Sequence, residues 1–278
     1  TLSYQRDKDG NRTSLTWPDS NVTTYSYDGL DRMSFLITNG NSGSTTYYYN
    51  NRGGRSYQAD VFWSSYLYDP AGRLSTINHD PAGSSQDVSY GFARNPAGQI
   101  SNRTISNDGY VWNGDVSVSR SYAVNGLNQY TSVSGGTVGY DDNGNLILSN
   151  STNYQYDVEN RLVSVSGAIN ASLRYDPLGR LYEVTGASGT TRFLYDGDEL
   201  VAEYNTSGTL LRRYVHGSGN DDPILWYEGS GVADSAGRRL RTDHQGSVVL
   251  VTDSGANSIA TNRYDEWGIP DATNLGRF

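Results

Sequence analysis

One short motif recurs along the chain and constrains its fold more than any single residue does. It reads Tyr-Asp-x-x-Gly-Arg-Leu, and successive copies start about 16 to 22 residues apart. A repeat of that length is typical of architectures that stack one small unit, so that each unit contacts its neighbours. The clearest copies contain Tyr27 and Asp28; Tyr68, Asp69, Gly72 and Arg73; Tyr140, Asp141 and Gly144; Tyr156, Asp157 and Arg161; Tyr175, Asp176, Gly179 and Arg180. Looser copies start at Tyr4, Tyr49, Tyr195, Tyr204 and Tyr264.

The chemistry of one copy predicts a β-hairpin. Asp side chains start turns by bonding the backbone one or two residues later, and the Gly supplies the positive φ that closes a short hairpin loop. The flanks are rich in Tyr, Val, Thr and Ile, and apolar and small polar residues alternate in Leu162–Ser166 and Val116–Ser119. A lone hairpin is marginal in water, so we expect the hairpins to pair side by side in a long antiparallel sheet.

The predicted fold class is therefore all-β: stacked antiparallel hairpin repeats that form a long spiralling sheet or hollow shell, with very little helix. No segment has sustained helical periodicity, Ala is scarce, and the chain contains 32 Gly. We expect residues 1–200 to be the hairpin array and residues 201–278 to continue the same sheet. Which face the motif tyrosines occupy stays open, because a slip of one residue exchanges the two faces.

Repetition argues that the motif residues are scaffold. Chemistry needs one site, whereas a scaffold needs many equal ones, so no single motif Asp is expected to be catalytic or to bind a metal. The Tyr is expected to be a rigid packing residue with its hydroxyl at the sheet edge; the alternative is a platform on which a sugar or base stacks. The Arg is expected to pair with the turn Asp or to lie over a Tyr ring.

Charge and composition restrict the partners. The net charge of -9 disfavours nucleic acid and anionic membranes, since phosphate binding needs a basic surface. The small basic cluster of Arg238, Arg239 and Arg241 is expected to be a solvated turn or strand edge. The chain has no Cys, which excludes disulfides and Cys-based metal sites. No apolar run is long enough to cross a bilayer, so membrane insertion is not expected.

A search for catalytic motifs finds none. His79, His216 and His244 are the only histidines, and no Gly-x-Ser-x-Gly sequence is present. We expect His244, next to Asp243, to be structural. Residues 7–11 and 141–145 faintly resemble calcium loops but lack the downstream Glu ligand. The sequence therefore predicts no enzyme activity, no cofactor, and no catalytic, cofactor-binding or metal-binding residues.

The repeats and a second motif together resemble the Rhs/YD-repeat family. The second motif follows the repeats, as in that family's core region, and contains Asp243, His244, Gly246, Ser247, Tyr264, Asp265 and Gly268. The resemblance implies that the repeats wind into a spiral sheet closing into a hollow shell. In the toxin members of the family, the shell is implied to hold a C-terminal toxin domain in an inert state.

The resemblance stops short of the family's chemistry. Toxin members continue into a segment with a self-cleaving aspartate pair, whereas this sequence ends at Asn274-Leu275-Gly276-Arg277-Phe278. No protease residue or toxin activity is therefore carried over, and we expect the sequence to be a piece of a longer chain.

The expected function is that of a structural shell segment of a secreted or cell-surface bacterial protein, which encloses or presents its own C-terminal effector. Two alternatives remain: an adhesive surface that binds glycans or other carbohydrate, and assembly with copies of itself into fibres through open sheet edges.

Overall fold

The computed structural model describes residues 1–40, 42–219 and 221–276. Arg277 and Phe278, the last two residues of the sequence, lie outside the described residues. The described residues contain no α-helix, and the predicted all-β class is confirmed. The first sheet has ten strands: β1 (Ser3–Arg6), β2 (Arg12–Thr16), β3 (Val22–Tyr27), β4 (Met33–Thr38), β5 (Ser42–Tyr49), β6 (Arg55–Ala59), β7 (Trp63–Tyr68), β8 (Leu74–Asp80), β9 (Val88–Arg94) and β10 (Ile100–Ile105).

The second sheet has fifteen strands. They are β11 (Tyr122–Val124), β12 (Tyr130–Val133), β13 (Gly136–Tyr140), β14 (Leu146–Ser149), β15 (Thr152–Tyr156), β16 (Leu162–Ser166), β17 (Ala171–Tyr175), β18 (Leu181–Gly186), β19 (Gly189–Asp196), β20 (Glu199–Tyr204), β21 (Leu210–His216), β22 (Pro223–Glu228), β23 (Gly237–Thr242), β24 (Val248–Thr252) and β25 (Ser258–Thr261). Three single 3-10 turns complete the elements: η1 (Ser84–Gln86), η2 (Asp108–Tyr110) and η3 (Asp234–Ala236).

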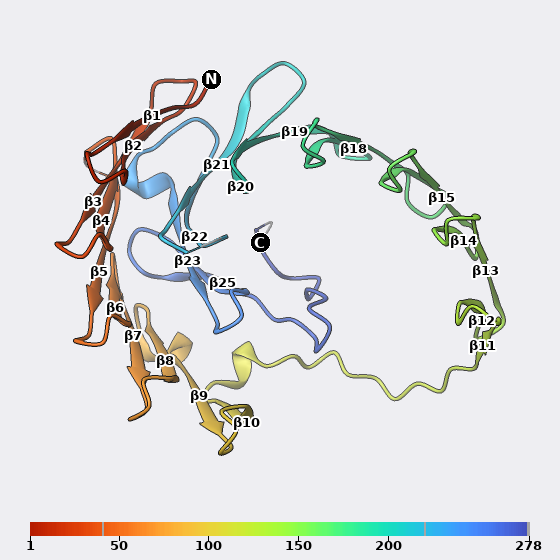
Figure 1. Cartoon of the computed structure of the whole chain (residues 1–278), viewed down its shortest axis with the longest axis horizontal. Helices are drawn as coiled ribbons and strands as arrows, with labels where there is room; N and C mark the ends of the chain where they lie inside the picture. The colour runs from red at the N-terminus through yellow and green to blue at the C-terminus, as the bar shows by residue number, and fades with distance from the viewer. Residues whose placement is uncertain (41, 220, 277–278) are drawn as a thin grey trace. The chain divides into compact units, whose positions relative to one another are not determined.

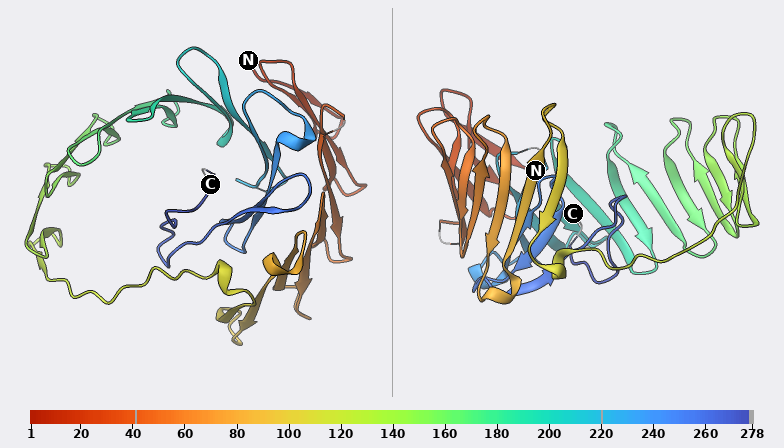
Figure 2. Two further views of the ribbon diagram at one scale, coloured as in Figure 1. Left: turned by 180° about the vertical axis from the view of Figure 1, so that it is seen from behind. Right: turned by 90° about the horizontal axis from the view of Figure 1, so that it is seen from below.

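In both sheets the spatial order of the strands is their order along the chain. The strand pairs with a resolved register are antiparallel, as expected of consecutive hairpins (Figure 2). The Tyr of each of the five clear copies marks a shift in this register: for example, the shift falls between Ser26 and Tyr27 in β3 and between Gln155 and Tyr156 in β15. The extra residue is a β-bulge, and it lets a short turn join two paired strands without splaying them.

The chain divides into two compact units. Unit 1 consists of Thr1–Gly114 and Arg212–Phe278, and unit 2 consists of Asp115–Leu211. The division predicted from the sequence, with its boundary at residue 200, rests on motif content and stays a prediction.

Unit 1 has two layers. Strands β22 to β24 lie against one face of the sheet formed by β1 to β10 (Figures 1 and 2). Ile77 and Tyr90 from the sheet, with Phe62 from the turn before β7, meet Val249 and Leu250 from β24 in one apolar cluster, in which every buried residue is less than 10 % exposed. Unit 1 therefore has an enclosed apolar core between its two layers.

Unit 2 is a single layer. None of residues 115–182 is buried, and the apolar residues of its strands are mostly half-exposed. The predicted strand at Val116–Ser119 is wrong: residues 112–120 belong to no strand, and Val116 and Val118 are 72 % and 57 % exposed. Alternation alone does not make a strand, because a strand also needs a partner with which its backbone can pair.

Candidate functional site

The motif turn is a compact hydrogen-bonded unit built around its Asp. In the copy that starts at Tyr27, one carboxylate oxygen of Asp28 accepts hydrogen bonds from the backbone nitrogens of Leu30 (2.9 Å) and Arg32 (3.1 Å). The other oxygen accepts from Arg32 Nε at 2.8 Å, and Nη2 of the same guanidinium lies 2.6 Å from it. Asp31 has a φ of 57°, which completes a turn that links β3 to β4.

The other clear copies repeat this arrangement. The left-handed position is filled by Gly72, Gly144, Asn160 and Gly179, the residue types that adopt positive φ most easily. The expected pair between the motif Arg and the turn Asp is present, at 2.7 Å in each case, for Arg73 with Asp69, Arg161 with Asp157, and Arg180 with Asp176. In the copy that starts at Tyr140, Asn145 takes the place of the Arg and donates to Asp141 at 2.9 Å.

These contacts keep the turn aspartates ionised. The side-chain hydrogen bond from Arg32 is the largest cause that lowers the pKa of Asp28. Backbone hydrogen bonds from Arg73 and Arg161 lead the causes that lower the pKa values of Asp69 and Asp157. Each carboxylate is thus committed to holding its own turn, which argues against a role in catalysis.

Motif tyrosines join each hairpin to the one before it. The hydroxyl of Tyr175 donates to the carbonyl of Leu162 at 2.8 Å, and that of Tyr195 donates to the carbonyl of Leu181 at 2.8 Å. In each case the acceptor is the residue directly after the motif Arg of the preceding copy. Equivalent bonds run from Tyr27 to Arg12, Tyr49 to Met33, Tyr68 to Arg55 and Tyr264 to Val248. We call this series of contacts the tyrosine ladder.

Motif arginines strengthen the same ladder. The guanidinium carbon lies over the ring of the next motif Tyr, at 4.3 Å for Arg32 and Tyr49, 5.0 Å for Arg161 and Tyr175, and 4.9 Å for Arg180 and Tyr195. One Arg therefore bonds the Asp of its own turn and also contacts the following repeat. The two roles expected as alternatives for the motif Arg occur together.

The core-like motif uses the same turn without the Arg. Asp243 accepts from the backbone nitrogens of Gln245 (2.8 Å) and Ser247 (3.1 Å), and Gly246 has a φ of 90°. His244 packs its ring against Phe92, with ring centroids 4.5 Å apart. Burial is the first cause that lowers the pKa of this His.

The second half of the core-like motif forms a further turn of the same type. Asp265 accepts from the backbone nitrogens of Trp267 (2.9 Å) and Ile269 (2.7 Å), and Gly268 has a φ of 81°. The described parts of the core-like motif are therefore structural in the same way as the repeats.

Sequence reasoning missed the position two residues before each motif Tyr, which we call the inner position. In unit 1 it is occupied by Tyr25 (4 % exposed) and Tyr47 (3 %), which point toward the covered face of the sheet. In unit 2 it is occupied by Tyr154 and Leu173, which are half-exposed, and near the end of the unit by Phe193, which is 6 % exposed. An apolar residue at this fixed offset from the Tyr-Asp pair is the sequence signal that could have revealed it.

The register of β15 to β18 gives this part of unit 2 one apolar and one polar face. Tyr154 lies opposite Val165, Val165 opposite Ala171, and Leu173 opposite Val184, so that these apolar residues share a face. The other face carries polar residues, which include Asn153, Gln155, Ser164, Ser172, Arg174 and Glu183.

The expectation that Arg239 and Arg241 are solvated is wrong. They are 2 % and 1 % exposed, and Arg238 is half-buried. Arg241 pairs with Asp60 at 2.7 Å and donates from Nε to Ser64 Oγ at 2.8 Å, while its guanidinium lies 4.2 Å from the ring centroid of Phe62. Sequence reasoning had no means of pairing these residues, because their partners are about 180 positions away in the chain.

His79 lies beside this ion pair. Its Nδ1 is 2.8 Å from Ser64 Oγ and its Nε2 is 3.1 Å from the carbonyl oxygen of Thr242, so the ring bridges β8 and the end of β23. Burial, followed by the charge of Arg241, lowers the pKa of His79 to about 3. This neutral, buried His therefore helps to hold β23 against the first sheet.

Two further observations bear on the chemistry. In the part of the chain that the structure describes, no group of three or more His, Asp or Glu side chains is arranged to hold a metal ion. Across the same residues, no helix is long and apolar enough to span a membrane.

Consecutive Tyr-Asp hairpins, joined by the tyrosine ladder into long antiparallel sheets, define the class of YD-repeat proteins. The chain belongs to the teneurin YD-shell family, whose sequence profile matches residues 59–270. This result confirms the resemblance to Rhs/YD-repeat proteins inferred from the motifs.

Bacterial relatives share about half of the chain. The tRNA3(Ser)-specific nuclease WapA of Bacillus spizizenii is 28 % identical over 153 residues, and the tRNA nuclease WapA of Bacillus subtilis (strain 168) is 26 % identical over 153 residues. Each match covers 53 % of this chain and 6 % of the relative. The chain therefore spans a small part of the length of these relatives.

Solved structures share the fold over nearly the whole chain. The Photorhabdus luminescens Tc holotoxin pore aligns with 97 % of this chain at a TM-score of 0.67 and 13 % identity. The TcdB2-TccC3 complex aligns with 97 % of it at a TM-score of 0.63 and 14 % identity. This chain covers 18 % of the matched chain in both structures.

Proposed function

We propose that the chain is a wall segment of a secreted or cell-surface bacterial YD-repeat protein, and that the wall encloses a C-terminal effector of the same protein. On this proposal the described segment is structural and carries no catalysis, cofactor, nucleic-acid contact or membrane insertion. Residues 1–200 supply the hairpin array, and residues 201–278 supply the last repeats and the beginning of the core-like region. Membership of the YD-shell family supports the proposal. It is also supported by the similarity in sequence to a protein named as a nuclease and by the similarity in fold to a structure named as a holotoxin.

The observation that carries the proposal is a difference between equivalent positions in the two units. In unit 1, inner-position residues such as Tyr25 and Tyr47 belong to a face that the chain's own 212–276 segment covers. In unit 2, Tyr154 and Leu173 occupy the same position, yet they are half-exposed on a single-layer sheet. A contiguous apolar face without a covering layer favours contact with another polypeptide. The effector segment is the occupant that the family membership implies.

Containment follows from the physical character of the wall. A strand that is paired on both sides has its backbone groups in hydrogen bonds, and a protease needs an extended, unpaired backbone. The tyrosine ladder and the Asp-Arg turns resist separation of successive hairpins. A polypeptide behind such a wall is shielded, and apolar side chains on the inner face can contact it without requiring it to be folded.

Site-specific photo-crosslinking in the whole parent protein tests the proposal. Leu173 and Arg174 are adjacent in β17 and point to opposite faces, so p-benzoylphenylalanine in place of each gives a matched pair. We expect irradiation to link position 173, and not position 174, to the C-terminal effector. Equal crosslinking from both positions, or crosslinks from 173 only to other proteins, would contradict the proposal.

A further inference from the structure

The face of unit 1 opposite the covered one carries a cluster of exposed aromatic side chains. Trp63 is 52 % exposed, Tyr48 46 % and Tyr57 44 %. Tyr48 stacks on Trp63 with ring centroids 5.8 Å apart and planes 24° apart, and Tyr57 meets Trp63 edge-on at 5.7 Å and 85°. Three rings that brace one another lose little conformational freedom when a ligand binds. They form a preorganised apolar platform.

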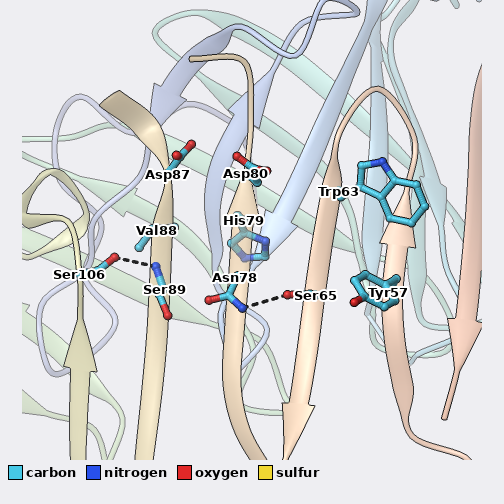
Figure 3. A pocket seen from close by; sticks show the side chains of 10 residues that line it. All are labelled: Tyr57, Trp63, Ser65, Asn78, His79, Asp80, Asp87, Val88, Ser89 and Ser106. Atoms are coloured by element: carbon cyan, nitrogen blue, oxygen red, sulfur yellow. Dashed lines mark hydrogen bonds between the residues drawn. The ribbon is translucent and has the colours of Figure 1, made fainter. Parts of the chain in front are cut away.

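A row of small polar side chains continues from this platform across the sheet. Tyr57 lies opposite Ser65, Ser65 opposite Asn78, and Asn78 opposite Ser89, on four successive strands. Since neighbouring strands are about 4.8 Å apart, hydroxyl and amide groups recur at that interval along the row. Figure 3 shows the row passing from the two aromatic rings to Ser106, with the Asn78–Ser65 and Ser89–Ser106 hydrogen bonds along it.

The same residues line one surface pocket, which also includes Asp80 and Asp87. Small side chains leave room above the floor of the pocket, and their hydroxyl and amide groups supply both hydrogen-bond donors and acceptors. His79 contributes to the floor but is committed to Ser64 and Thr242.

Charge at the rim of the pocket restricts the ligand. Asp80 lies directly opposite Trp63 in the β7–β8 register, and Figure 3 places Asp87 beside Asp80. Burial and the neighbouring Asp80 raise the pKa of Asp87, in keeping with two carboxyl groups close together. With the net charge of -9, these carboxyl groups repel sulfated and carboxylated ligands.

We propose that this pocket is a binding site for an uncharged glycan chain, whose sugar ring stacks on Trp63 and whose hydroxyl groups meet the Ser65–Asn78–Ser89 row. The flat C–H face of a sugar ring matches an exposed indole, and its hydroxyl groups match a floor that offers donors and acceptors together. A folded protein partner fits this surface less well, because the apolar area is confined to one end of a polar row. The pocket shares no residue with the apolar face of unit 2, which is the face proposed to contact the effector.

Isothermal titration of the chain with cellohexaose, xylohexaose, mannohexaose and a heparin hexasaccharide tests the site. We expect at least one of the three neutral hexasaccharides to bind with a Kd of about 1 mM, and the heparin hexasaccharide not to bind. Trp63→Ala is expected to weaken binding at least about tenfold. Trp267→Ala is the matched control, because Trp267 is 82 % exposed in a turn far along the chain and should leave the affinity unchanged.

A second variant separates the polar row from the platform. Ser65→Leu keeps the three rings and fills the floor, so it should also weaken binding, while far-UV circular dichroism shows that each variant remains folded. The proposal fails if no neutral hexasaccharide binds at about 10 mM, if the heparin hexasaccharide binds more tightly, or if Trp63→Ala leaves the affinity unchanged. It also fails if Trp63→Ala converts a dimer to a monomer, since the platform would then be a contact between copies.

Discussion

Arg241 and Asp60 form an ion pair of 2.7 Å in which both side chains are 1 % exposed, although 181 positions separate them in the sequence. The pair joins β23 to the turn before β7 and lies beside the bridge that His79 makes between β8 and Thr242. Among the ion pairs of the described residues that join the 212–276 segment to the first sheet, it is the one in which both side chains are most deeply buried. Other contacts of this kind are Arg213 with Asp19 and Arg55 with Asp222.

Removing one member of this pair should be costly. Asp60→Asn leaves the guanidinium of Arg241 buried without its counter-charge, and we expect the free energy of unfolding to fall by about 3–5 kcal/mol. Equilibrium urea unfolding measures the change. Arg174→Gln is the matched control: Arg174 is 76 % exposed and 3.5 Å from Glu183, so its loss should cost less than about 1 kcal/mol. If the two variants lose similar stability, the buried pair does not contribute more to the stability of the fold than an exposed ion pair does.

The sequence predicts contacts between residues that are close along the chain, and it does not predict contacts between distant residues. The turn around Asp28 was predictable because all of its partners lie within four residues, and local chemistry decides its shape. The burial of Arg241 was not predictable, because its partners are about 180 residues away in the sequence. Nothing in the sequence next to Arg241 distinguishes a buried Arg from an exposed one. The strand expected at Val116–Ser119 failed for a related reason, since alternation does not reveal whether a partner strand is available.

The candidate site divides in the same way. The motif Arg was expected to pair with Asp or to lie over Tyr, and both contacts follow from the repeat itself. The inner position and the platform around Trp63 could not be assigned, because which face of the sheet is covered depends on where the 212–276 segment packs. Tyr48, Tyr57 and Trp63 lie within 16 positions of one another in the sequence, but nothing in the sequence shows that their side chains are exposed.

The tyrosine ladder should contribute to stability through its hydroxyl groups. Tyr175→Phe removes the 2.8 Å hydrogen bond to the carbonyl of Leu162 while it keeps the ring on which Arg161 lies. We expect a loss of about 1 kcal/mol, the usual net contribution of one hydrogen bond. Thermal unfolding followed by circular dichroism provides the measurement. Tyr182→Phe, at a tyrosine that is 42 % exposed, should leave the midpoint unchanged; an equal loss in both variants would argue against the ladder.

Stability should fall on mild acidification because of His79. Its folded-state pKa of about 3 lies below its ordinary value of 6.5, so the unfolded chain binds a proton more readily than the folded chain does. The stability that neutral His79 contributes is complete above pH 6.5 and is lost progressively as the pH falls toward 3. Urea midpoints measured between pH 7.5 and pH 4 should therefore decline in the wild type, and the decline should be shallower in His79→Gln.

The turn aspartates set a second, lower pH range. Their folded-state pKa values lie below the ordinary value of 3.8, so their contribution is present above that pH and is lost as the pH falls further. His79→Gln should therefore converge with the wild type in its pH dependence only below about pH 3, where His79 is protonated in the folded chain as well. If the variant keeps the full slope between pH 7.5 and pH 4, another group controls the acid response.

The first site of proteolysis should be the segment that failed to form a strand. Residues 112–120 belong to no strand, and Arg120 is an exposed trypsin site within them, whereas arginines such as Arg161 and Arg180 are held by turn aspartates. Proteases cut where the backbone is exposed and unpaired. Brief trypsin digestion followed by mass spectrometry should therefore first yield fragments 1–120 and 121–278. Arg120→Gln should slow this first cleavage at least about tenfold, while Arg174→Gln, which alters an exposed Arg within β17, should not. An initial cut inside β1 to β10 would contradict the assignment, because it would mean that the paired strands open more readily than the exposed segment is cleaved.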